Sequence, residues 1–219
     1  MAADELSRAV QDYLKAIYVL DAAGVQVTTS ALAERMSVSA PSATAMMKRL
    51  AELGLAERAP YRGIALTEAG RRGALEMLRH HRLLERYLVD TLGVPLDKVH
   101  AEAERLEHVL SEELEERIDE ALGFPTHDPH GDPIPNRDLE LVTSERRALL
   151  DLAPGDHATV SRVPDNDADV LRYLDELALI PGEAVELTAI APFGGPISVR
   201  TASGEHAIAR ELAAVVGVD

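Results

Sequence analysis

The first third of the chain has the hydrophobic pattern of three short helices followed by a hairpin. Apolar residues recur at helical spacing over residues 6–21, and shorter helical patterns cover residues 28–36 and 39–54. Pro41 fits the first turn of the third helix, where its missing N–H leaves no hydrogen bond unmade. Two β-type runs surround APYRG and predict a hairpin. This order of elements predicts a winged helix-turn-helix, whose third helix would enter a major groove of DNA.

Three further helical patterns occupy the middle of the chain. A long one begins at Thr67 and ends at Gly93, a second covers residues 97–110, and a third covers residues 111–122. Leucines recur through all three, so this segment can bury a core and still offer an apolar face to a second copy of the chain. We therefore expect a helical dimerisation domain.

The pattern changes after residues 124–144, where four prolines prevent a helix and indicate a linker. Short β-type runs follow, interrupted by one acidic helical piece, DADVLRYLDELAL, and this order fits a small SH3-like barrel. The prediction is a mainly α protein with a small β domain. Its expected domains are a winged helix-turn-helix over residues 1–74, a helical domain over 75–140 and an SH3-like domain over 145–219.

The amino-acid composition limits which side chains could bind a metal. Because the chain has no cysteine, it has no disulfides and no thiolate ligands, which leaves imidazole and carboxylate side chains to bind a metal. The net charge is −16, but residues 1–75 hold nine Lys or Arg against eight Asp or Glu. The first 75 residues are therefore nearly neutral, and the rest of the chain is strongly acidic. A nearly neutral N-terminal segment can bind DNA if its basic groups share one face. With neither a secretory signal nor an apolar run of about 18 residues, we expect a cytoplasmic protein without a membrane partner.

The stretch VHAEAERLEHVLSEE, residues 99–113, is rich in histidine and glutamate. If it is one α-helix, His100, Glu104, Glu107 and His108 fall within an arc of about 100°. Two imidazoles and two carboxylates on one face suit a divalent first-row metal. One helix cannot enclose an ion, so further ligands must come from elsewhere, and the candidates are His81 and Glu85, at positions i and i+4, and Asp12.

The alternative interpretation is an ordinary solvated acidic face, which is the common role of acid-rich helices. Glu102, Glu112 and Glu113 fit that role. For the remaining histidines outside the cluster we expect exposed or capping positions, and Pro and Gly in HDPHGDP are taken as marks of tight turns. These histidines are His80, His127, His130 and His206.

Six segments are distinctive in their order and spacing. RHHRLLERYL, DKVHAEAERLEHVLSEELEERI and DPHGDPIP lie in the middle of the chain, and AVQDYLKAIYVL, VSAPSATAMMKRLAELGL and YRGIALTEAGR lie near its start. Over about residues 6–135 they resemble the diphtheria toxin repressor (DtxR) family of metal-dependent transcription factors. The C-terminal part keeps only the family's SH3-like, FeoA-type pattern.

The resemblance implies two metal sites that join the DNA-binding and dimerisation domains. The matching positions are Asp12, Glu104, Glu107 and His108 for the primary site, and His81, Glu85 and His100 for the second, which Asp167 or a neighbouring aspartate of the C-terminal domain would complete. Iron-type members of the family have sulfur, from Met or Cys, where this sequence has Asp12 and Glu104. Carboxylates are harder ligands, so the expected cofactor is Mn²⁺, with Fe²⁺ as the alternative. Lys15 departs from some manganese regulators of the family, which have a further acidic ligand at that position.

Small residues at the start of the third helix are placed to reach base edges, and nearby basic residues to reach phosphates. The predicted DNA contacts are Ser39, Pro41, Ser42, Thr44, Lys48, Arg49 and Arg62.

The resulting hypothesis is a homodimeric, Mn²⁺-activated repressor that binds palindromic operators of metal-homeostasis genes and has no small organic substrate. An iron-responsive repressor is the nearest alternative. A metal-dependent hydrolase or oxidase is less favoured, because the chain has no HExxH motif and no pair of helical ExxH motifs. A scaffold with an acidic body is a third alternative.

Overall fold

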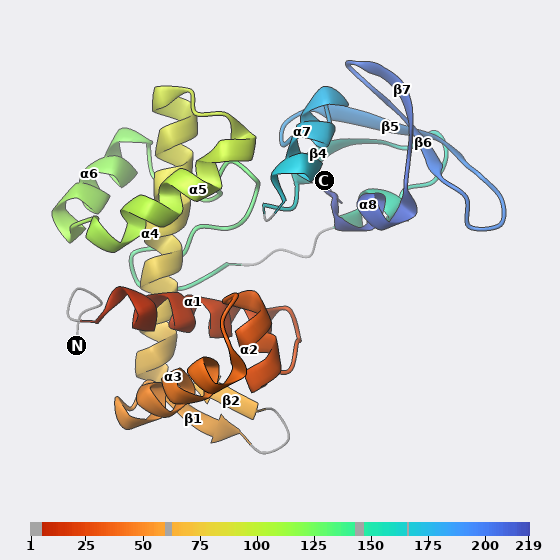
Figure 1. Ribbon diagram of the computed structural model, residues 1–219. Coiled ribbons are helices and arrows are strands. Elements are labelled where there is room, and N and C mark those ends of the chain that lie inside the picture. The colour runs from red at the N-terminus through yellow and green to blue at the C-terminus, as the bar shows by residue number, and fades with distance from the viewer. Residues whose placement is uncertain (1–5, 60–62, 143–146, 166) are drawn as a thin grey trace. The chain divides into compact units, whose positions relative to one another are not determined.

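A computed structural model describes residues 6–59, 63–142, 147–165 and 167–219 (Figure 1). The chain divides into two compact units. The first comprises residues 1–81, 106–112 and 135–141, and the second comprises residues 82–105, 113–134 and 142–219. The division falls within one long helix, between His81 and Arg82.

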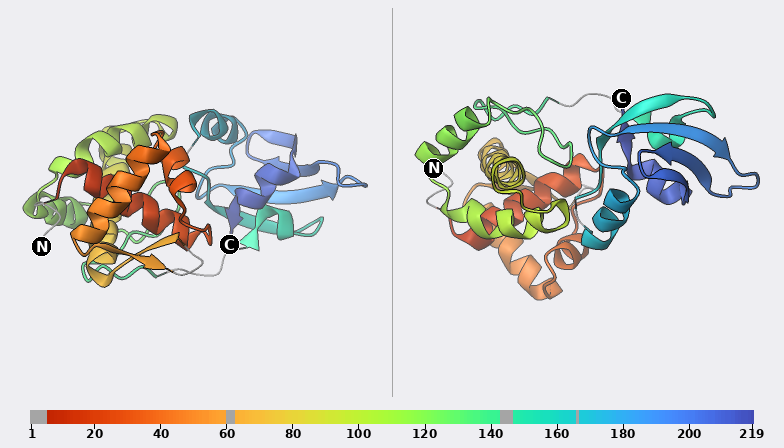
Figure 2. Two further views of the ribbon diagram at one scale, coloured as in Figure 1. Left: turned by 60° about the horizontal axis from the view of Figure 1, so that its bottom comes forward. Right: turned by 90° about the horizontal axis from the view of Figure 1, so that it is seen from above.

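The first unit contains the predicted winged helix-turn-helix. Leu14, Ile17, Leu32 and Leu50 are fully buried in its core, and Figure 2 (left) shows the third helix and the hairpin turned toward the viewer. Its elements are α1 (Arg8–Ala22), α2 (Thr29–Arg35), α3 (Ala40–Glu52), β1 (Ala56–Ala59) and β2 (Gly63–Leu66).

Local side-chain chemistry fixes the starts of α2 and α3. The Thr28 hydroxyl accepts a hydrogen bond from the Ala31 N–H at 3.1 Å, and the Ser39 hydroxyl accepts one from the Ser42 N–H at 3.3 Å. Each satisfies one of the N–H groups that the first helical turn leaves without an intrahelical acceptor. The predicted cap at Ser39 and the predicted place of Pro41 in the first turn of α3 are confirmed.

The hairpin of β1 and β2 is antiparallel and is tied to the segment before α2. Ile64 N–H donates to the Val27 carbonyl at 3.1 Å. Gly63 has φ +87°, and a Cβ at this position would lie 2.1 Å from the Val27 oxygen, so the close approach requires glycine. The predicted DNA contact Arg62 lies outside the described residues.

The helices of the middle segment begin with α4, which crosses from one unit to the other. In the second unit, α5 and α6 lie beside its C-terminal part, which Figure 2 (right) shows end on. The second predicted helix needs a correction: it is α-helical only to Leu106, and residues 107–109 form a 3₁₀ turn. The Glu107 carbonyl oxygen accepts a hydrogen bond from His80 Nδ1 at 3.3 Å, so its partner is a side chain of another helix. The elements are α4 (Glu68–Leu92), α5 (Leu96–Leu106), η2 (Glu107–Val109) and α6 (Glu112–Ala121).

Part of the proline-rich segment is packed rather than a free linker. Asp128 Oδ1 accepts hydrogen bonds from the His130 and Asp132 N–H groups, both at 2.9 Å, so the predicted tight turn is present. The expectation of an exposed or capping histidine is wrong at His130, which is fully buried, and at His80, which is 3% exposed. His127 is exposed as expected, whereas His206 is half-buried on β7.

The C-terminal segment of the second unit is the predicted small β domain. Its six strands form an antiparallel sheet in the order β3-β8-β4-β5-β6-β7 around a core that includes Leu174, Leu187 and Ile197. The run HAIAREL is only partly a strand, because α8 begins at Arg210. The elements are β3 (Arg147–Ala148), η3 (Leu149–Asp151), β4 (His157–Arg162), α7 (Ala168–Glu176), β5 (Ala184–Ile190), β6 (Ile197–Thr201), β7 (Gly204–Ile208), α8 (Arg210–Val215) and β8 (Gly217–Val218).

Candidate metal centres and nucleic-acid interface

Three metal-binding side chains meet between α1 and η2 in the first unit. Asp12, Glu107 and His108 each offer a ligand atom, and these atoms lie within 4.8 Å of one another. His108 Nε2 is 2.9 Å from Asp12 Oδ1 and 3.5 Å from Glu107 Oε1. Because Glu107 and His108 are on a 3₁₀ turn rather than in the predicted helix, it is the turn that directs both side chains toward α1.

The partner of the other imidazole nitrogen fixes the tautomer of His108. Its Nδ1 donates to Gln11 Oε1 at 2.8 Å, so in the neutral ring the lone pair is on Nε2. Nε2 is buried and makes no hydrogen bond with any residue that the structure describes. A lone pair that faces two carboxylate groups is unfavourable unless a cation or a proton lies between them. The donor set therefore fits a divalent metal.

Glu107 is 1% exposed and is held by two cationic or hydrogen-bonding partners. Lys15 Nζ donates to its Oε1 at 2.6 Å, and His81 Nδ1 donates to its Oε2 at 2.5 Å. The second contact fixes the tautomer of His81, whose Nε2 is then the nitrogen with the lone pair. His81 lies one helical turn before Glu85 on α4.

A second cluster lies in the second unit. Glu85 is fully buried, and its Oε1 is 3.1 Å from His100 Nδ1 of α5. Its Oε2 is 3.6 Å from Nδ1 of the buried His130. Glu85, Asp128 and His130 also offer ligand atoms within 4.8 Å of one another. Sequence reasoning left Asp128 and His130 out, although the spacing of HDPHGDP was a signal for them.

Burial, together with the neighbouring charges of Glu85 and Asp132, raises the pKa of Asp128 to about 7. Burial opposes protonation of His130, but the hydrogen bond and the negative charge of Glu85 outweigh it and raise the His130 pKa above its ordinary value. The cluster therefore holds more negative charge than its surroundings neutralise.

Two further predicted ligands are Glu104 and Asp167. Glu104 is half-buried on α5, one turn before Glu107. Asp167 is exposed and caps α7, where its carboxylate accepts hydrogen bonds from the Asp169 and Val170 N–H groups at 2.9 and 3.1 Å. Within the described parts of the chain, no group of three potential metal ligands includes Asp167. Another group, Glu76, His80 and Glu112, was not foreseen from the sequence.

The predicted DNA contacts described by the structure lie on α3 and at its N-cap. Ser39, Pro41, Ser42, Thr44, Lys48 and Arg49 are all exposed.

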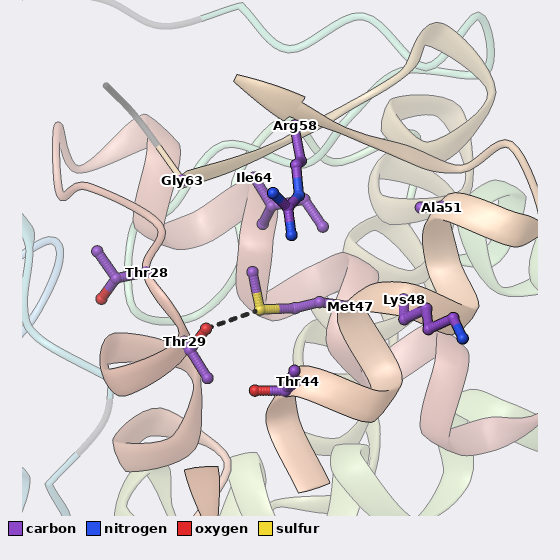
Figure 3. Close-up of a pocket in the computed structure, with 9 residues that line it drawn as sticks. All are labelled: Thr28, Thr29, Thr44, Met47, Lys48, Ala51, Arg58, Gly63 and Ile64. Carbon is purple, nitrogen blue, oxygen red and sulfur yellow. Dashed lines mark hydrogen bonds between the residues drawn. The ribbon is translucent and has the colours of Figure 1, made fainter. Parts of the chain in front are cut away.

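A pocket of about 750 Å³ lies beside them, between α3, the start of α2 and the hairpin (Figure 3). Thr29 donates a hydrogen bond to the Met47 sulfur at 3.4 Å across this pocket, and Arg58 reaches from β1 toward Met47. Arg58 was not predicted as a DNA contact, because in the sequence it is only a charged residue in a short strand. The lining residues are Thr28, Thr29, Thr44, Met47, Lys48, Ala51, Arg58, Gly63 and Ile64.

Three family models match the chain in succession. They describe the iron dependent repressor N-terminal DNA binding domain over residues 5–64, the iron dependent repressor metal binding and dimerisation domain over residues 67–136, and the FeoA domain over residues 147–219. With the fold above, they define a DNA-binding regulator with a metal-binding dimerisation domain. No helix of the described residues is long and apolar enough to cross a membrane.

Similar proteins match from about half of the chain to nearly all of it. The iron-dependent repressor IdeR of Mycobacterium tuberculosis is 34% identical over 99% of both chains, and the diphtheria toxin repressor of Corynebacterium efficiens is 41% identical over 56% of this chain and 54% of its own. A solved manganese-dependent transcriptional repressor in complex with manganese is 42% identical, covers 96% of this chain and 99% of its own, and has a TM-score of 0.85. The manganese regulator SloR, 31% identical over 96% and 97%, has a TM-score of 0.77.

The chain belongs to the diphtheria toxin repressor family of metal-dependent transcriptional repressors, which are DNA-binding proteins and not enzymes.

Proposed function

We propose that this chain is a Mn²⁺-activated, homodimeric repressor that binds palindromic operators of metal-homeostasis genes in the cytoplasm. The observation that carries the proposal is the His108 Nε2 lone pair, which faces the Asp12 and Glu107 carboxylates. A divalent cation bound there supplies the positive charge that these side chains need. Asp12 would then hold α1 of the DNA-binding domain against the η2 turn.

The ligand chemistry supports manganese. The proposed primary ligands Asp12, Glu104, Glu107 and His108 offer only oxygen and nitrogen, and none of them supplies sulfur. Solved neighbours are described as manganese-dependent, at 42% identity and below. The alternative, an Fe²⁺-activated repressor, is favoured by the iron-dependent relatives at 34% identity.

For the second site we propose His81, Glu85 and His100, with one acid from the C-terminal domain. Glu85 and His100 are already in contact at 3.1 Å, and the fixed tautomer of His81 leaves Nε2 able to bind a metal. Asp167 is the acid expected from the sequence. Asp165 is the alternative, because its charge contributes to the raised pKa of His130.

For DNA we propose that α3 enters a major groove and that the pocket beside it receives the sugar–phosphate backbone. The exposed small residues Ser39, Pro41, Ser42 and Thr44 would face base edges. Lys48, Arg49, Arg62 and Arg58 would neutralise phosphates. Ordering of α1 by metal lowers the cost of DNA binding, so metal and DNA favour each other reciprocally.

The test is a titration of the full-length protein on a duplex selected from random sequences in the presence of Mn²⁺. Binding is measured with Mn²⁺, Fe²⁺ or Zn²⁺ at matched free concentrations, and with excess chelator. We expect tight binding with Mn²⁺ and a loss of at least about tenfold in chelator. Equal affinity in chelator would refute the metal switch, and a stronger response to Fe²⁺ than to Mn²⁺ would refute the choice of metal.

A further inference from the structure

A third cluster of metal-binding side chains lies where α4 meets the η2 turn and the start of α6. Glu76, His80 and Glu112 each offer a ligand atom, and these atoms lie within 4.8 Å of one another. All three residues belong to the first unit. None of them is among the ligands proposed above for the primary site or the second site, so neither site explains why they converge.

The helical period brings two of these side chains together. Glu76 and His80 are four residues apart on α4, so they lie one turn apart on the same face of the helix. Glu112, the first residue of α6, supplies the third group from a different element. His80 is 3% exposed, Glu76 is half-buried and Glu112 is exposed. The cluster is therefore buried at the imidazole and open to solvent at Glu112.

A hydrogen bond to the backbone orients the His80 ring as a ligand. Its Nδ1 donates to the Glu107 carbonyl oxygen at 3.3 Å, so the lone pair of the neutral ring is on Nε2. Metal-binding histidines commonly use one ring nitrogen for the metal while the other donates to a carbonyl or carboxylate oxygen. The free nitrogen of this pattern, Nε2, is the atom that lies near Glu112, with Oε1 at 3.9 Å.

The gap between His80 and Glu112 suits a shared cation better than a direct contact. At 3.9 Å, the distance from Nε2 to Oε1 is longer than a hydrogen bond. Two ligand atoms that each lie about 2.1 Å from one ion are at most about 4.2 Å apart, so a single ion can contact both. Two carboxylates and one imidazole suit a divalent first-row metal, and their two negative charges equal the charge of the ion.

The alternative is that Glu112 is only an acid at the start of a helix. Acidic side chains in the first turn of a helix are stabilised by the helix dipole without any metal. That role accounts equally well for Glu113, the next residue, which is exposed and pairs with Arg117. It does not explain why Glu76 and the buried His80 converge on Glu112. Glu113 is therefore the matched control for a metal-binding role of Glu112.

Glu107 connects this cluster to the proposed primary site. Its carbonyl oxygen accepts the hydrogen bond from His80, and its carboxylate lies 3.5 Å from His108 Nε2. A cation on His80 Nε2 withdraws electrons from the ring and strengthens the Nδ1–H donor. An ion in the cluster would thus fix the η2 turn through its backbone, without using any primary ligand.

We propose that His80 Nε2 and the carboxylates of Glu76 and Glu112 bind a further divalent first-row cation, separate from the ions of the primary and second sites. The ion would hold the η2 turn and the start of α6 against α4. Three protein ligands leave positions for water, so this ion would exchange with solvent at the Glu112 side. The inference goes beyond the proposed function and does not depend on DNA binding.

The test is a Mn²⁺ titration of the full-length protein, with the free ion measured by electron paramagnetic resonance, which gives the number of ions bound per chain. We expect Glu112→Gln and His80→Gln each to bind one ion fewer than the wild type over the same range of free Mn²⁺. Glu113→Gln should bind the wild-type number. Glu112→Gln is the decisive variant, because it changes an exposed side chain to one of the same size and leaves the His80–Glu107 hydrogen bond in place. Circular dichroism confirms that each variant is folded.

A wild-type ion count in Glu112→Gln would overturn the inference, as would a loss in Glu113→Gln of the same size, because that would be a general effect of surface charge. A loss in Glu112→Gln that His80→Gln does not share would overturn it too, since the proposed site includes the imidazole. Failure of the proposed function is seen separately, as wild-type DNA binding that does not respond to metal, and it leaves the ion count of Glu112→Gln to decide this inference.

Discussion

The Lys15 ammonium lies 2.6 Å from Glu107 Oε1, and the same oxygen is 3.5 Å from His108 Nε2. The lysine side chain is 14% exposed and the Glu107 carboxylate is fully buried. A positive charge from α1 thus compensates a carboxylate of the proposed primary site. Lys15 and a metal ion must then compete for Glu107.

Replacing Lys15 should strengthen metal binding. Lys15→Met keeps most of the aliphatic side chain and removes the charge, so we expect Mn²⁺ to bind about tenfold more tightly, roughly 1.4 kcal/mol. Competition with a fluorescent chelator measures the dissociation constant. Lys48→Met is the control, because Lys48 is exposed on α3, where its ammonium is 3.8 Å from the Glu52 carboxylate. Weaker Mn²⁺ binding in Lys15→Met would show instead that the ammonium supports the site.

Gln11 should matter for metal binding without touching the metal. It accepts the hydrogen bond of His108 Nδ1 at 2.8 Å and so keeps the lone pair on Nε2. Gln11→Leu removes this acceptor, and a loss of about tenfold to a hundredfold in Mn²⁺ affinity is expected, as for other groups that orient metal ligands. The same chelator competition measures it, with the exposed Gln26→Leu as the control. Equal affinities in the two variants would contradict the role of Gln11.

Removing a proposed ligand should abolish the metal response. We expect His108→Ala and Glu104→Ala to bind the selected duplex no better with Mn²⁺ than with chelator, while thermal unfolding of the metal-free protein changes little. Glu113→Ala serves as the control, because Glu113 is exposed and pairs with Arg117 on α6. Gel-shift titration gives the metal dependence. A wild-type response in both variants would refute the assignment of the primary site.

The helical pattern was sufficient to predict the winged domain. Caps, a proline at the start of α3 and a period of 3.6 residues are local signals, and the structure agrees with them from α1 to β2. The change of α5 into the η2 turn at Glu107 was not predictable in the same way. It depends on contacts with His80 and Lys15, which are far away in the sequence.

The candidate metal site was also only partly predictable from the sequence. Spacing identified His100, Glu104, Glu107 and His108 as a group but placed all four on one helical face. Nothing local distinguishes His130, which the structure buries, from the exposed His127 three residues earlier. Burial of His130 results from packing of its loop on β4, which is a long-range event.

The stability of the metal-free protein should fall as the pH rises. The pKa of Asp128 is raised from 3.8 to about 7 in the folded state, and that of His130 is also raised. The folded protein therefore binds more protons than the unfolded chain between these values, and stability declines as the pH rises from about 4 through 7. Urea unfolding between pH 5 and 8 should show this slope. It should be smaller in Asp128→Asn, and an unchanged slope would contradict the role of Asp128.

We expect Arg58 to increase the affinity for DNA without affecting sequence specificity. It is exposed on β1 and reaches into the pocket beside α3, where we expect a phosphate (Figure 3). Arg58→Ala should weaken binding to selected and unrelated duplexes by the same factor. It should also lower the slope of log affinity against log salt by about one, since one fewer counterion is released. Arg117→Ala, an exposed arginine on α6, controls for net charge. A loss confined to the selected duplex would mean that Arg58 reads bases.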